Sequence, residues 1–342
     1  MVAIESDVPL APKTTLGIGG AARRFARVGS VDELQEALRS DDNVLILGGG
    51  SNIVIGDAGW DGLVVQIGMT GIAIKHEGDH AIVVAGAGEN WDELVAQTID
   101  EGLAGLECLS GIPGLVGATP MQNVGAYGQE VADTIERVRV LDRRTGELVD
   151  FAPHACQFAY RTSVFKGRTR WVVTEVQFRL PRSRTSMPLR YPELARGLGI
   201  REGGRAPLAE VREKVIALRR GKGMVIDPLD PESRSVGSFF MNPIVDKHAL
   251  ETLEEKLDAS TTIPLWPADA GRTKLSAAWL IERAGFRKGY TVGRVGISKK
   301  HALAIVNRGG ASAREVLALA TEIQDRVRDK LGIELVPEPV IV

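Results

Sequence analysis

A glycine-rich turn near the start of the chain carries the residue types of an anion-binding loop. Gly48-Gly-Gly-Ser-Asn52 offers three backbone N–H groups that no side chain covers, followed by a hydroxyl and an amide. Successive N–H groups of this kind form a concave nest that suits a phosphate or a pyrophosphate. A plain tight turn has the same composition, so the residues alone leave the two interpretations equal.

A second turn, Gly86-Ala-Gly88, lies between a strand pattern and a helix pattern, where a Rossmann fold carries the sequence G-x-G-x-x-G. Trp91 occupies the place of the third glycine, and its bulk prevents the close contact between helix and strand that the motif needs. A Rossmann site is therefore disfavoured. The chain also has no G-x-x-x-x-G-K-[ST] sequence, which excludes a P-loop nucleotide hydrolase by this route.

The longest irregular stretch, residues 111–128, contains five glycines and two prolines among apolar residues and the polar Thr119, Gln122 and Asn123. A long apolar loop is unusual in a compact domain unless it lines a site. A rigid wall with few side chains and several amide groups suits a flat heteroaromatic ring that needs hydrogen bonds at its edge. A surface loop, which is the alternative, should be more polar than this stretch.

Composition and charge are those of a globular protein with more than one domain. The 342 residues suffice for two or three domains, and 44% of them are apolar and 25% charged. The net charge of -2 gives no overall basic field for nucleic acid, and no apolar run is long enough to cross a bilayer. Cys108 and Cys156 form no C-x-x-C pair and the histidines are scattered, so we expect a reducing cytoplasm and no metal site.

Capping signals and hydrophobic periodicity predict the elements that must position these residues. Ser30, Asn90 and Ser312 each stand three residues before a glutamate, which is the pattern of a helix start. The predicted helices cover residues 31–39, 91–101, 207–220, 246–257, 274–284 and 313–331, and the predicted strands cover residues 44–47, 53–55, 81–84, 137–151 (a hairpin), 170–180, 292–297 and 302–306. Residues 181–206, rich in Arg, Pro and Gly, are predicted to form a surface excursion. The architecture is α+β in three segments.

Seven sequence blocks together resemble the UDP-N-acetylenolpyruvoylglucosamine reductase (MurB) family, in order along nearly the whole chain. The blocks are Thr15-Leu-Gly-Ile-Gly19, Leu47-Gly-Gly-Gly-Ser-Asn52, Gly111-Ile-Pro-Gly114 through Gly125-Ala-Tyr-Gly128, Tyr160-Arg-Thr-Ser-Val-Phe-Lys166, Gly237-Ser-Phe-Phe-Met-Asn-Pro243, Lys299-Lys-His-Ala-Leu303 and Pro337-Glu338. The resemblance implies an α+β protein with the FAD-binding fold of the vanillyl-alcohol-oxidase type in two N-terminal subdomains, residues 1–70 and 71–220. A C-terminal α+β substrate domain over residues 221–332 should follow. The tail, residues 333–342, is expected to pack back on the second subdomain.

The resemblance also implies which residues hold the cofactor. The expected FAD contacts are Gly48, Gly49, Gly50, Ser51, Asn52, Ile112, Gly117, Thr119, Gln122, Asn123, Gly125, Ala126, Tyr127 and Gly128. Oxidases of this fold often link the flavin to a histidine beside the glycine turn. Because Ser51 and Asn52 stand there, the FAD should be non-covalent, and NADPH is the implied reductant.

The implied reaction belongs to peptidoglycan precursor synthesis and reduces the enolpyruvyl ether of UDP-N-acetylglucosamine by hydride transfer from reduced flavin. The carbanion character that hydride transfer leaves must be stabilised and then protonated. Arg161 matches the family's carboxylate-binding arginine, and Ser238 matches its proton donor. Glu338 matches a second stabilising residue, which a carboxyl group can be only if it is protonated or holds another donor. Without the resemblance, a surface ion pair, a turn hydroxyl and a tail charge are the favoured interpretations.

The implied substrate contacts are Tyr160, Tyr191, Lys222, Asn242, Lys288 and His301. Arg190-Tyr191-Pro-Glu-Leu194 looks like the mobile tyrosine loop of one family subtype, although Pro192 departs from the small residue expected after the tyrosine. An aromatic that only pins a loop is the alternative for Tyr191. We expect a monomer that binds neither nucleic acid nor membrane. Two other functions stay open: a different FAD oxidase or dehydrogenase of the same fold, and a nucleotide-sugar binding protein without chemistry.

Overall fold

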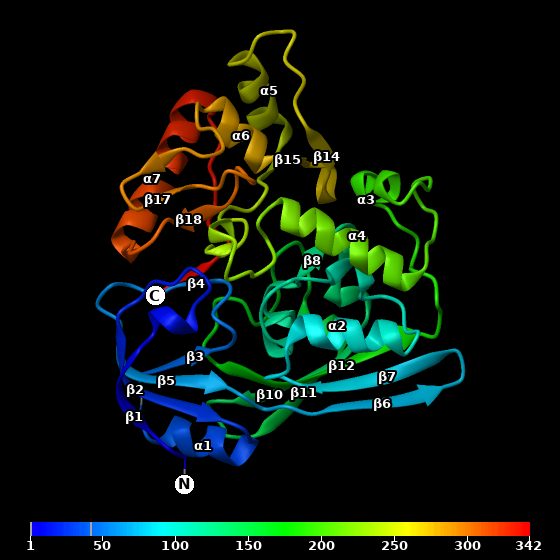
Figure 1. Ribbon diagram of the computed structural model, residues 1–342, viewed down its shortest axis with the longest axis vertical. Helices are drawn as coiled ribbons and strands as arrows, with labels where there is room; N and C mark the ends of the chain where they lie inside the picture. Colours follow the sequence, from blue (N-terminus) through cyan, green and yellow to red (C-terminus); the bar gives the residue numbers. More distant parts are fainter. Residues whose placement is uncertain (1, 42) are drawn as a thin grey trace. The chain divides into compact units, whose positions relative to one another are not determined.

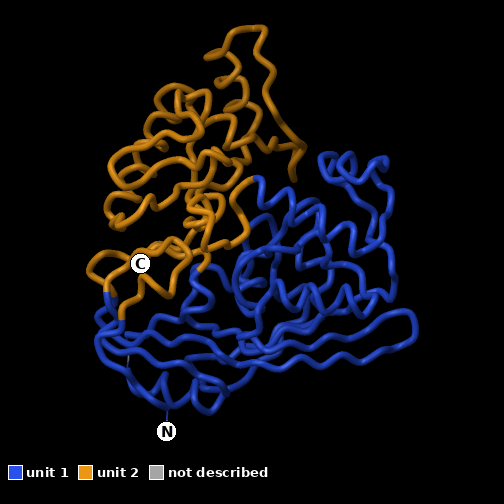
Figure 2. The backbone as a smooth tube through the Cα atoms, viewed as in Figure 1, with its two compact units in different colours: residues 1–8, 21–50, 60–221 blue, residues 9–20, 51–59, 222–342 orange. Residues whose placement is uncertain are grey.

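The chain forms two compact units, each assembled from segments that are separate in the sequence (Figure 2). The computed structural model describes residues 2–41 and 43–342. Unit 1 contains Met1–Val8, Ala21–Gly50 and Trp60–Gly221, and unit 2 contains Pro9–Gly20, Ser51–Gly59 and Lys222–Val342. Two short N-terminal pieces are therefore built into the unit that holds the C-terminal part of the chain.

The first sheet of unit 1 has the strand order β1-β2-β5-β3. Its strands are β1 (Glu5–Pro9), β2 (Ala21–Val28), β3 (Val44–Leu47) and β5 (Trp60–Ile67). Strand β5 pairs in parallel with both β2 and β3, and its residues 63–65 are fully buried, as expected for the central strand of a parallel arrangement. Helix α1 (Val31–Arg39) connects β2 to β3, and Ser30 caps it as predicted. The Glu33 carboxylate accepts a hydrogen bond from the N–H of Gly29.

The second sheet of unit 1 is antiparallel and has the order β11-β10-β12-β7-β6 (Figure 1). Its strands are β6 (Ile72–Glu77), β7 (His80–Gly86), β10 (Ile135–Asp142), β11 (Leu148–Phe151) and β12 (Trp171–Pro181). The predicted hairpin over residues 137–151 is confirmed. Its turn is closed by a bond from Gly146 N–H to the Asp142 carbonyl, and Gly146 adopts the left-handed φ of +72° that glycine allows.

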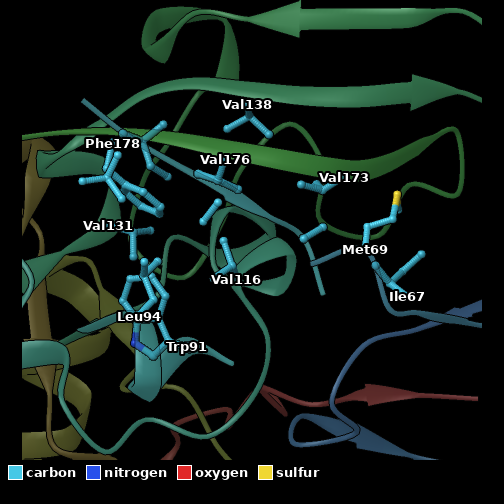
Figure 3. Packing of buried hydrophobic residues seen from close by; sticks show 14 of the residues in the cluster. Ile67, Met69, Trp91, Leu94, Val116, Val131, Val138, Val173, Val176 and Phe178 are labelled. Atoms are coloured by element: carbon cyan, nitrogen blue, oxygen red, sulfur yellow. The ribbon is translucent and has the colours of Figure 1, made fainter. Parts of the chain in front are cut away.

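Helix α2 (Trp91–Asp100) packs on this sheet, and α4 (Leu208–Gly221) lies beside it. The irregular stretch runs between helices and sheet as short 3-10 helices, η2 (Glu107–Leu109), η3 (Val116–Ala118) and η4 (Pro120–Gln122). Figure 3 shows Val116 of η3 within the same buried cluster as Leu94 of α2 and Val176 of β12. This position between two layers explains why a segment without regular structure is apolar.

The prediction of a surface excursion over residues 181–206 is wrong in part. Leu189, Leu194 and Ala206 are buried and pack with apolar residues of α4. Helix α3 (Pro192–Gly197) lies within this stretch. The apolar residues within 181–206 follow neither the helical nor the strand period over a useful length. The sequence pattern therefore did not reveal that some of them form a small buried cluster with α4.

Unit 2 is built from short strands and three named helices. The strands are β4 (Ile53–Val54), β13 (Ile244–Val245), β14 (Leu265–Pro267), β15 (Thr273–Leu275), β16 (Thr291–Val292), β17 (Val295–Ile297), β18 (Ile305–Asn307) and β19 (Val340–Ile341), and the helices are α5 (Lys247–Glu255), α6 (Ala277–Arg283) and α7 (Ala313–Leu331). The helix predicted over residues 274–284 begins later, because β15 occupies its first positions and Ser276 caps α6. Helix α7 agrees with the prediction at both ends, with a capping box between Ser312 and Glu315 and left-handed Gly332 after its last residue.

The core of unit 2 joins its N-terminal pieces to its C-terminal elements. Leu16, Ile18 and Val54 are buried in one cluster with apolar residues of α6 and α7. Strand β19 pairs in parallel with β4, and the N–H of Val340 donates to the Asn52 carbonyl at 3.0 Å. Among residues 2–41 and 43–342, none of the helices combines the length and apolar character that crossing a bilayer requires.

Candidate active site

The glycine turn after β3 packs directly against the segment that follows α2. A Cβ added to Gly49 would lie 3.0 Å from the Cα of Gly114, and one added to Gly117 would lie 2.5 Å from the Cβ of Ala87. These separations leave no room for side chains. Residues 48–50 and 111–118, six of which are glycines, therefore form a glycine-rich layer whose backbone is closely packed at Gly49 and Gly117, and these residues together are called the cofactor wall.

The start of the cofactor wall is held by charged residues that sequence reasoning missed. Asp92 Oδ1 accepts from the N–H of Gly111 at 2.5 Å, and Arg212 donates two bonds to Asp92 at 2.6 and 2.9 Å. Burial alone would raise the pKa of Asp92, but the bonds from Arg212 and Gly111 hold it below its ordinary value. The buried Arg219 donates from Nε to the Gly111 carbonyl at 3.1 Å. In the sequence these residues looked like ordinary members of two amphipathic helices, so no local signal marked them.

Just after the wall in the sequence, Thr119 and Asn123 form hydrogen bonds with other groups of the protein. The Thr119 hydroxyl donates to the carbonyl three residues earlier at 2.8 Å. Asn123 Nδ2 donates to Glu130 Oε2 at 2.6 Å and to the Ala159 carbonyl at 3.3 Å, and its Oδ1 accepts from the Ala132 N–H at 3.1 Å. Both side chains are buried. These bonds make Thr119 and Asn123 supports that fix the course of the wall.

Left-handed backbone at residues other than glycine is concentrated beside this wall. Asn123, Tyr127 and Arg161 have φ values of +48°, +50° and +54°. Each such conformation costs on the order of 1–3 kcal/mol and persists only where the surrounding contacts impose it, often at functional sites. Tyr127 occupies the turn between β8 (Gly125–Ala126) and β9 (Gln129–Glu130), which pair as a small antiparallel hairpin.

The Arg161 guanidinium is fixed against this hairpin. Its Nη2 donates to the Gly125 carbonyl at 2.5 Å, and its Cζ lies 5.4 Å from the centre of the Tyr160 ring. The Arg161 carbonyl accepts from Lys166 Nζ at 2.9 Å. A Cβ on Gly125 would approach Arg161 Nη1 to 3.2 Å, so the glycine lets the guanidinium lie close to the backbone. Residues from two separate sequence blocks, Gly125 from one and Tyr160 and Arg161 from the other, are thus brought together.

Tyr191 stands at the start of α3, directly before Pro192. Proline is favoured at the first position of a helix because its missing N–H has no helical partner there, which accounts for Pro192 in this place. The Tyr191 ring meets the Tyr127 ring edge-on, with 5.2 Å between the ring centres. The structure therefore brings the predicted substrate residue Tyr191 to the far end of the stretch predicted to bind the cofactor.

The cofactor wall fits the expected FAD. A flat ring system suits a wall with few side chains, and the six glycines of residues 48–50 and 111–118 provide one, while the close packing at Gly49 and Gly117 fixes its course. The glycine turn at residues 48–50 presents backbone rather than side chains at the edge of the wall, which suits a pyrophosphate. Ser51 and Asn52 continue this turn into unit 2.

In unit 2, the side chains of a serine and a histidine and the backbone of a glutamate meet at one short segment. Ser238 Oγ lies 3.5 Å from His301 Nε2. The next residue, Phe239, donates its N–H to the Leu303 carbonyl at 2.8 Å, and its own carbonyl accepts from the N–H of Glu338 at 2.9 Å. The segment that carries Ser238 is therefore bonded on one side to the loop of His301 and on the other to the tail that carries Glu338.

Glu232, another residue that sequence reasoning missed, holds the loop that leads to His301. Its Oε2 accepts from the Lys299 N–H at 2.7 Å, and its Oε1 accepts from Arg308 Nη1 at 2.5 Å. Burial alone would raise the pKa of Glu232, but bonds from Ser298, Arg308 and Lys299 hold it below its ordinary value. A single glutamate and a single arginine far apart in the sequence give no pattern that could have predicted this contact.

Two of the three residues predicted to contact the diphosphate and the uridine, Lys288 and Lys222, stand beside glycines that pack against the His301 loop or the Glu232 segment. Lys288 is exposed in a turn, and a Cβ on the following Gly289 would lie 3.5 Å from Lys299 Cγ. Lys222 precedes Gly223, where an added Cβ would lie 3.0 Å from the Glu232 carbonyl oxygen. Asn242 lies apart from them, because its Oδ1 accepts from the Ala277 N–H at the start of α6, at 2.9 Å.

The predicted catalytic residues are divided between the two units. Arg161 belongs to unit 1, and Ser238 and Glu338 belong to unit 2. Each unit therefore carries part of the proposed chemistry. Among the residues that the structure describes, no cluster of His, Cys, Asp and Glu is arranged to hold a metal ion.

Comparison with known proteins identifies both halves of the chain. Residues 22–152 match a FAD binding domain family, and residues 227–342 match the C-terminal domain of UDP-N-acetylenolpyruvoylglucosamine reductase. The chain is 52% identical to the UDP-N-acetylenolpyruvoylglucosamine reductase of Thermobifida fusca, and the alignment covers 98% of this chain and 97% of that one. The chain belongs to the UDP-N-acetylenolpyruvoylglucosamine reductase (MurB) family.

Two further members of this family extend the comparison. The UDP-N-acetylenolpyruvoylglucosamine reductase of Salinispora arenicola is 48% identical over 99% of this chain and 95% of its own length. The crystal structure of MurB from Thermus caldophilus superimposes with a TM-score of 0.68 at 26% identity and covers 100% of this chain. The predicted fold class is confirmed: a FAD-binding domain of the vanillyl-alcohol-oxidase type is joined to an α+β MurB C-terminal domain. The prediction of an FAD-dependent oxidoreductase is confirmed with it.

Proposed function

We propose that the protein reduces the enolpyruvyl ether of UDP-N-acetylglucosamine to UDP-N-acetylmuramate, with NADPH as the reductant. The observation that carries this proposal is the convergence of Ser238, His301 and Glu338 around Phe239 in the domain that matches the family. Bound FAD supplies the hydride that the vinyl carbon receives. The residues of the chain must bind the substrate, stabilise the negative charge that develops on it and provide a proton.

Arg161 holds the substrate carboxylate in this proposal. A guanidinium stays charged at any working pH, and its planar fork matches both oxygens of a carboxylate. Its contact with the Gly125 carbonyl and its strained backbone support a preorganised position, because a fixed cation stabilises developing charge without first having to rearrange.

Ser238 gives the proton to the substrate carbon, and Glu338 assists. An alcohol is a weak acid, but a carbanion is a strong base, so the proton transfer is downhill. The bond between Glu338 N–H and the Phe239 carbonyl supports this pairing, because it ties the two residues to the same backbone segment. A carboxylate beside a developing enolate would repel it, so Glu338 acts in its protonated form or by holding another donor.

The remaining predicted contacts complete the proposal. Lys222, Lys288 and Asn242 suit a diphosphate and a uridine, because cations and amides bind such groups. Tyr160, Tyr191 and His301 are proposed to contact the substrate, with Tyr191 closing over it as in the subtype with a tyrosine loop. FAD is proposed to contact, without a covalent link, Gly48, Gly49, Gly50, Ser51, Asn52, Ile112, Gly117, Thr119, Gln122, Asn123, Gly125, Ala126, Tyr127 and Gly128.

We propose a cytoplasmic monomer with three working segments, residues 1–70, 71–220 and 221–332. Cys108 and Cys156 are free and buried, and burial raises the pKa of the Cys156 thiol to about 12. Unpaired thiols are typical of proteins from a reducing compartment, which supports the proposed location.

Half-reactions of the Ser238→Ala variant test the function. Reduction of the flavin by NADPH should keep its rate, because the hydroxyl plays no part in that step. Turnover with the enolpyruvyl substrate should fall by about 10²- to 10⁴-fold, the usual loss for a general acid. Stopped-flow absorbance measures both steps, and Ser260→Ala, which changes an exposed serine of the same unit, is the control.

Three results would count against the proposal. Equal slowing of both steps would mean that Ser238 shapes the flavin site. A flavin that air reoxidises rapidly after reduction would favour an oxidase of the same fold. A purified protein without flavin absorbance would favour a binding protein without chemistry.

A further inference from the structure

The contact between Ser238 and His301 raises the question of which group donates. The 3.5 Å between Oγ and Nε2 is at the outer limit of a hydrogen bond, and both side chains are partly exposed. Catalytic hydrogen bonds are often long in the absence of substrate and shorten when it binds. A contact at this distance is therefore a candidate for a bond that forms during the reaction.

Backbone hydrogen bonds fix the position of the Ser238 side chain relative to that of His301. Phe239 follows Ser238 and donates its N–H to the carbonyl of Leu303, two residues after His301, at 2.8 Å. The loop of His301 is also closed on itself, because Ala304 N–H donates to the His301 carbonyl at 3.2 Å and Ser298 N–H donates to the Ala304 carbonyl at 2.8 Å. Two braced backbone segments keep the imidazole opposite the hydroxyl.

The role of Ser238 decides the direction of the bond. The Ser238 O–H must point at the substrate carbon in order to protonate it, so this hydrogen is not available to His301. The imidazole must then donate through Nε2–H to Oγ. A donor placed at an oxygen where negative charge develops stabilises the transition state of the proton transfer.

We propose that His301 is a positioning residue that orients Ser238 and returns a proton to it after each turnover. This inference rests on the proposed function, since it assumes that Ser238 is the proton donor. The Oγ–H bond breaks as the C–H bond forms, and Oγ then takes the proton from Nε2 of the imidazolium. The neutral imidazole is reprotonated by solvent. One proton from solvent is consumed for each hydride added, which balances the reduction of the vinyl group. In this role His301 acts on the reaction through Ser238, in addition to the substrate contact proposed above.

Charged groups of both signs lie on the loop of His301 and on the segments that contact this loop or the Ser238 segment. Lys299 and Lys300 stand on its own loop, and Lys300 Nζ donates to Asp230 at 2.7 Å. Glu232 and Arg308 pair beneath the loop, Lys288 lies in the turn that packs on Lys299, and Glu338 stands on the tail beyond Phe239. The cations on the loop disfavour the imidazolium and the carboxylates favour it. The protonated fraction of His301 therefore depends on the whole cluster, and the second half-reaction should slow as pH rises and this fraction falls.

Two substitutions of His301 separate hydrogen bonding from proton return. His301→Ala removes the donor and should slow the step with the enolpyruvyl substrate about 10²- to 10³-fold, the loss found for a single donor at a developing oxyanion. His301→Gln should slow it less, because the amide can still donate, but the fall of its rate with rising pH should disappear. Both variants should keep the rate of flavin reduction by NADPH. His248→Gln, at an exposed position on α5, is the matched control.

A measurement on the resting holoenzyme tests the contact without turnover. The ¹⁵N resonance of His301 Nε2 should shift in Ser238→Ala if the two groups are bonded, whereas the resonances of His248 should not. The double variant Ser238→Ala/His301→Ala should be no slower than Ser238→Ala alone, because His301 acts through Ser238.

The outcomes distinguish this inference from the function on which it rests. If Ser238→Ala is slow and the His301 variants have normal rates, the proposed return of a proton by His301 is wrong, but the proposed function stands. A fast Ser238→Ala would overturn both. If the His301 variants slowed both half-reactions equally or lost flavin, His301 would be a support of the fold and the inference would be wrong.

Discussion

In unit 1 the cofactor wall is shaped by backbone packing, with Gly117 lying against Ala87 and Gly49 against Gly114. In unit 2 the Ser238 segment is held by hydrogen bonds to neighbouring loops, and its surroundings are charged. The first region should respond mainly to added volume, and pH should act on it only through the Asp92–Arg212 pair that holds its start. The second should tolerate small changes of volume better and respond to the loss of a charge. A site that binds a flat ring and a site that moves a proton thus depend on different properties of their surroundings.

Adding one methyl group to the cofactor wall is the most severe test of this comparison. Gly117→Ala places a Cβ 2.5 Å from the Cβ of Ala87, so the backbone on one side must move. We expect loss of bound flavin and of nearly all activity, with destabilisation of about 1–3 kcal/mol. The ratio of flavin to protein absorbance and the Tm measure these effects.

The control for this substitution is Gly221→Ala, at the end of α4. An added Cβ there meets no described heavy atom within 4 Å. Its flavin content should match that of the original protein. Normal flavin content in Gly117→Ala would show that the wall adapts to added volume. The expected sensitivity of unit 1 to added volume would then be wrong.

Arg161 places a functional charge in the first region, because its guanidinium is fixed beside the cofactor wall. Arg161→Lys keeps the charge but loses the planar fork, so we expect kcat/KM for the enolpyruvyl substrate to fall by on the order of 10²-fold, the equivalent of about 2–3 kcal/mol in lost charge-assisted bonds. Steady-state kinetics measure the loss, and Arg168→Lys, at an exposed neighbour, is the control. A near-normal rate would remove Arg161 from the mechanism.

Loss of one buried charge should loosen the second region, with a smaller effect on flavin binding and activity than the two substitutions above. Glu232→Gln weakens the bonds to Arg308 and to the Lys299 N–H and should cost on the order of 2–3 kcal/mol of stability. Flavin content should be unchanged, because the cofactor wall is not involved. Thermal unfolding and flavin absorbance of the same sample separate the two effects.

The pH dependence of this variant sharpens the test. The pKa of Glu232 is lowered in the folded protein, so its contribution to stability is complete above its unfolded value, about 4.3, and is lost as pH falls through the lower folded value. The difference in Tm between the original protein and Glu232→Gln should therefore be constant near neutral pH and shrink below about pH 4. A constant difference throughout would mean that the carboxylate charge does not hold the loop.

Much of the fold could be predicted because its signals are local. Ser30, Asn90 and Ser312 cap their helices as their spacing predicts, and Gly332 ends α7. The positions of Ser238 and His301 could be predicted as site residues only through the resemblance of their sequence blocks. Their mutual contact could not, because it depends on the pairing of Phe239 with Leu303, which no local pattern encodes.

The parts that escaped prediction are contacts between distant residues. Asp92 and Arg212 join α2 to α4, and Glu232 and Arg308 join two loops of unit 2. Each is an ordinary surface residue by its local context, and only the fold makes it a partner. The cluster around Leu194 was missed for a related reason, since it is buried by α4 and not by neighbours in the sequence.

The interleaving of the two units has a consequence for the way the chain folds during synthesis. Residues 9–20 and 51–59 leave the ribosome early, yet the rest of their unit starts at Lys222. At roughly 5–20 residues per second, the apolar Leu16, Ile18 and Val54 must wait on the order of ten seconds for their partners. During this interval they are exposed to water while unit 1 is still being made between them. The early part of the nascent chain is therefore where chaperone binding, or aggregation without it, should concentrate.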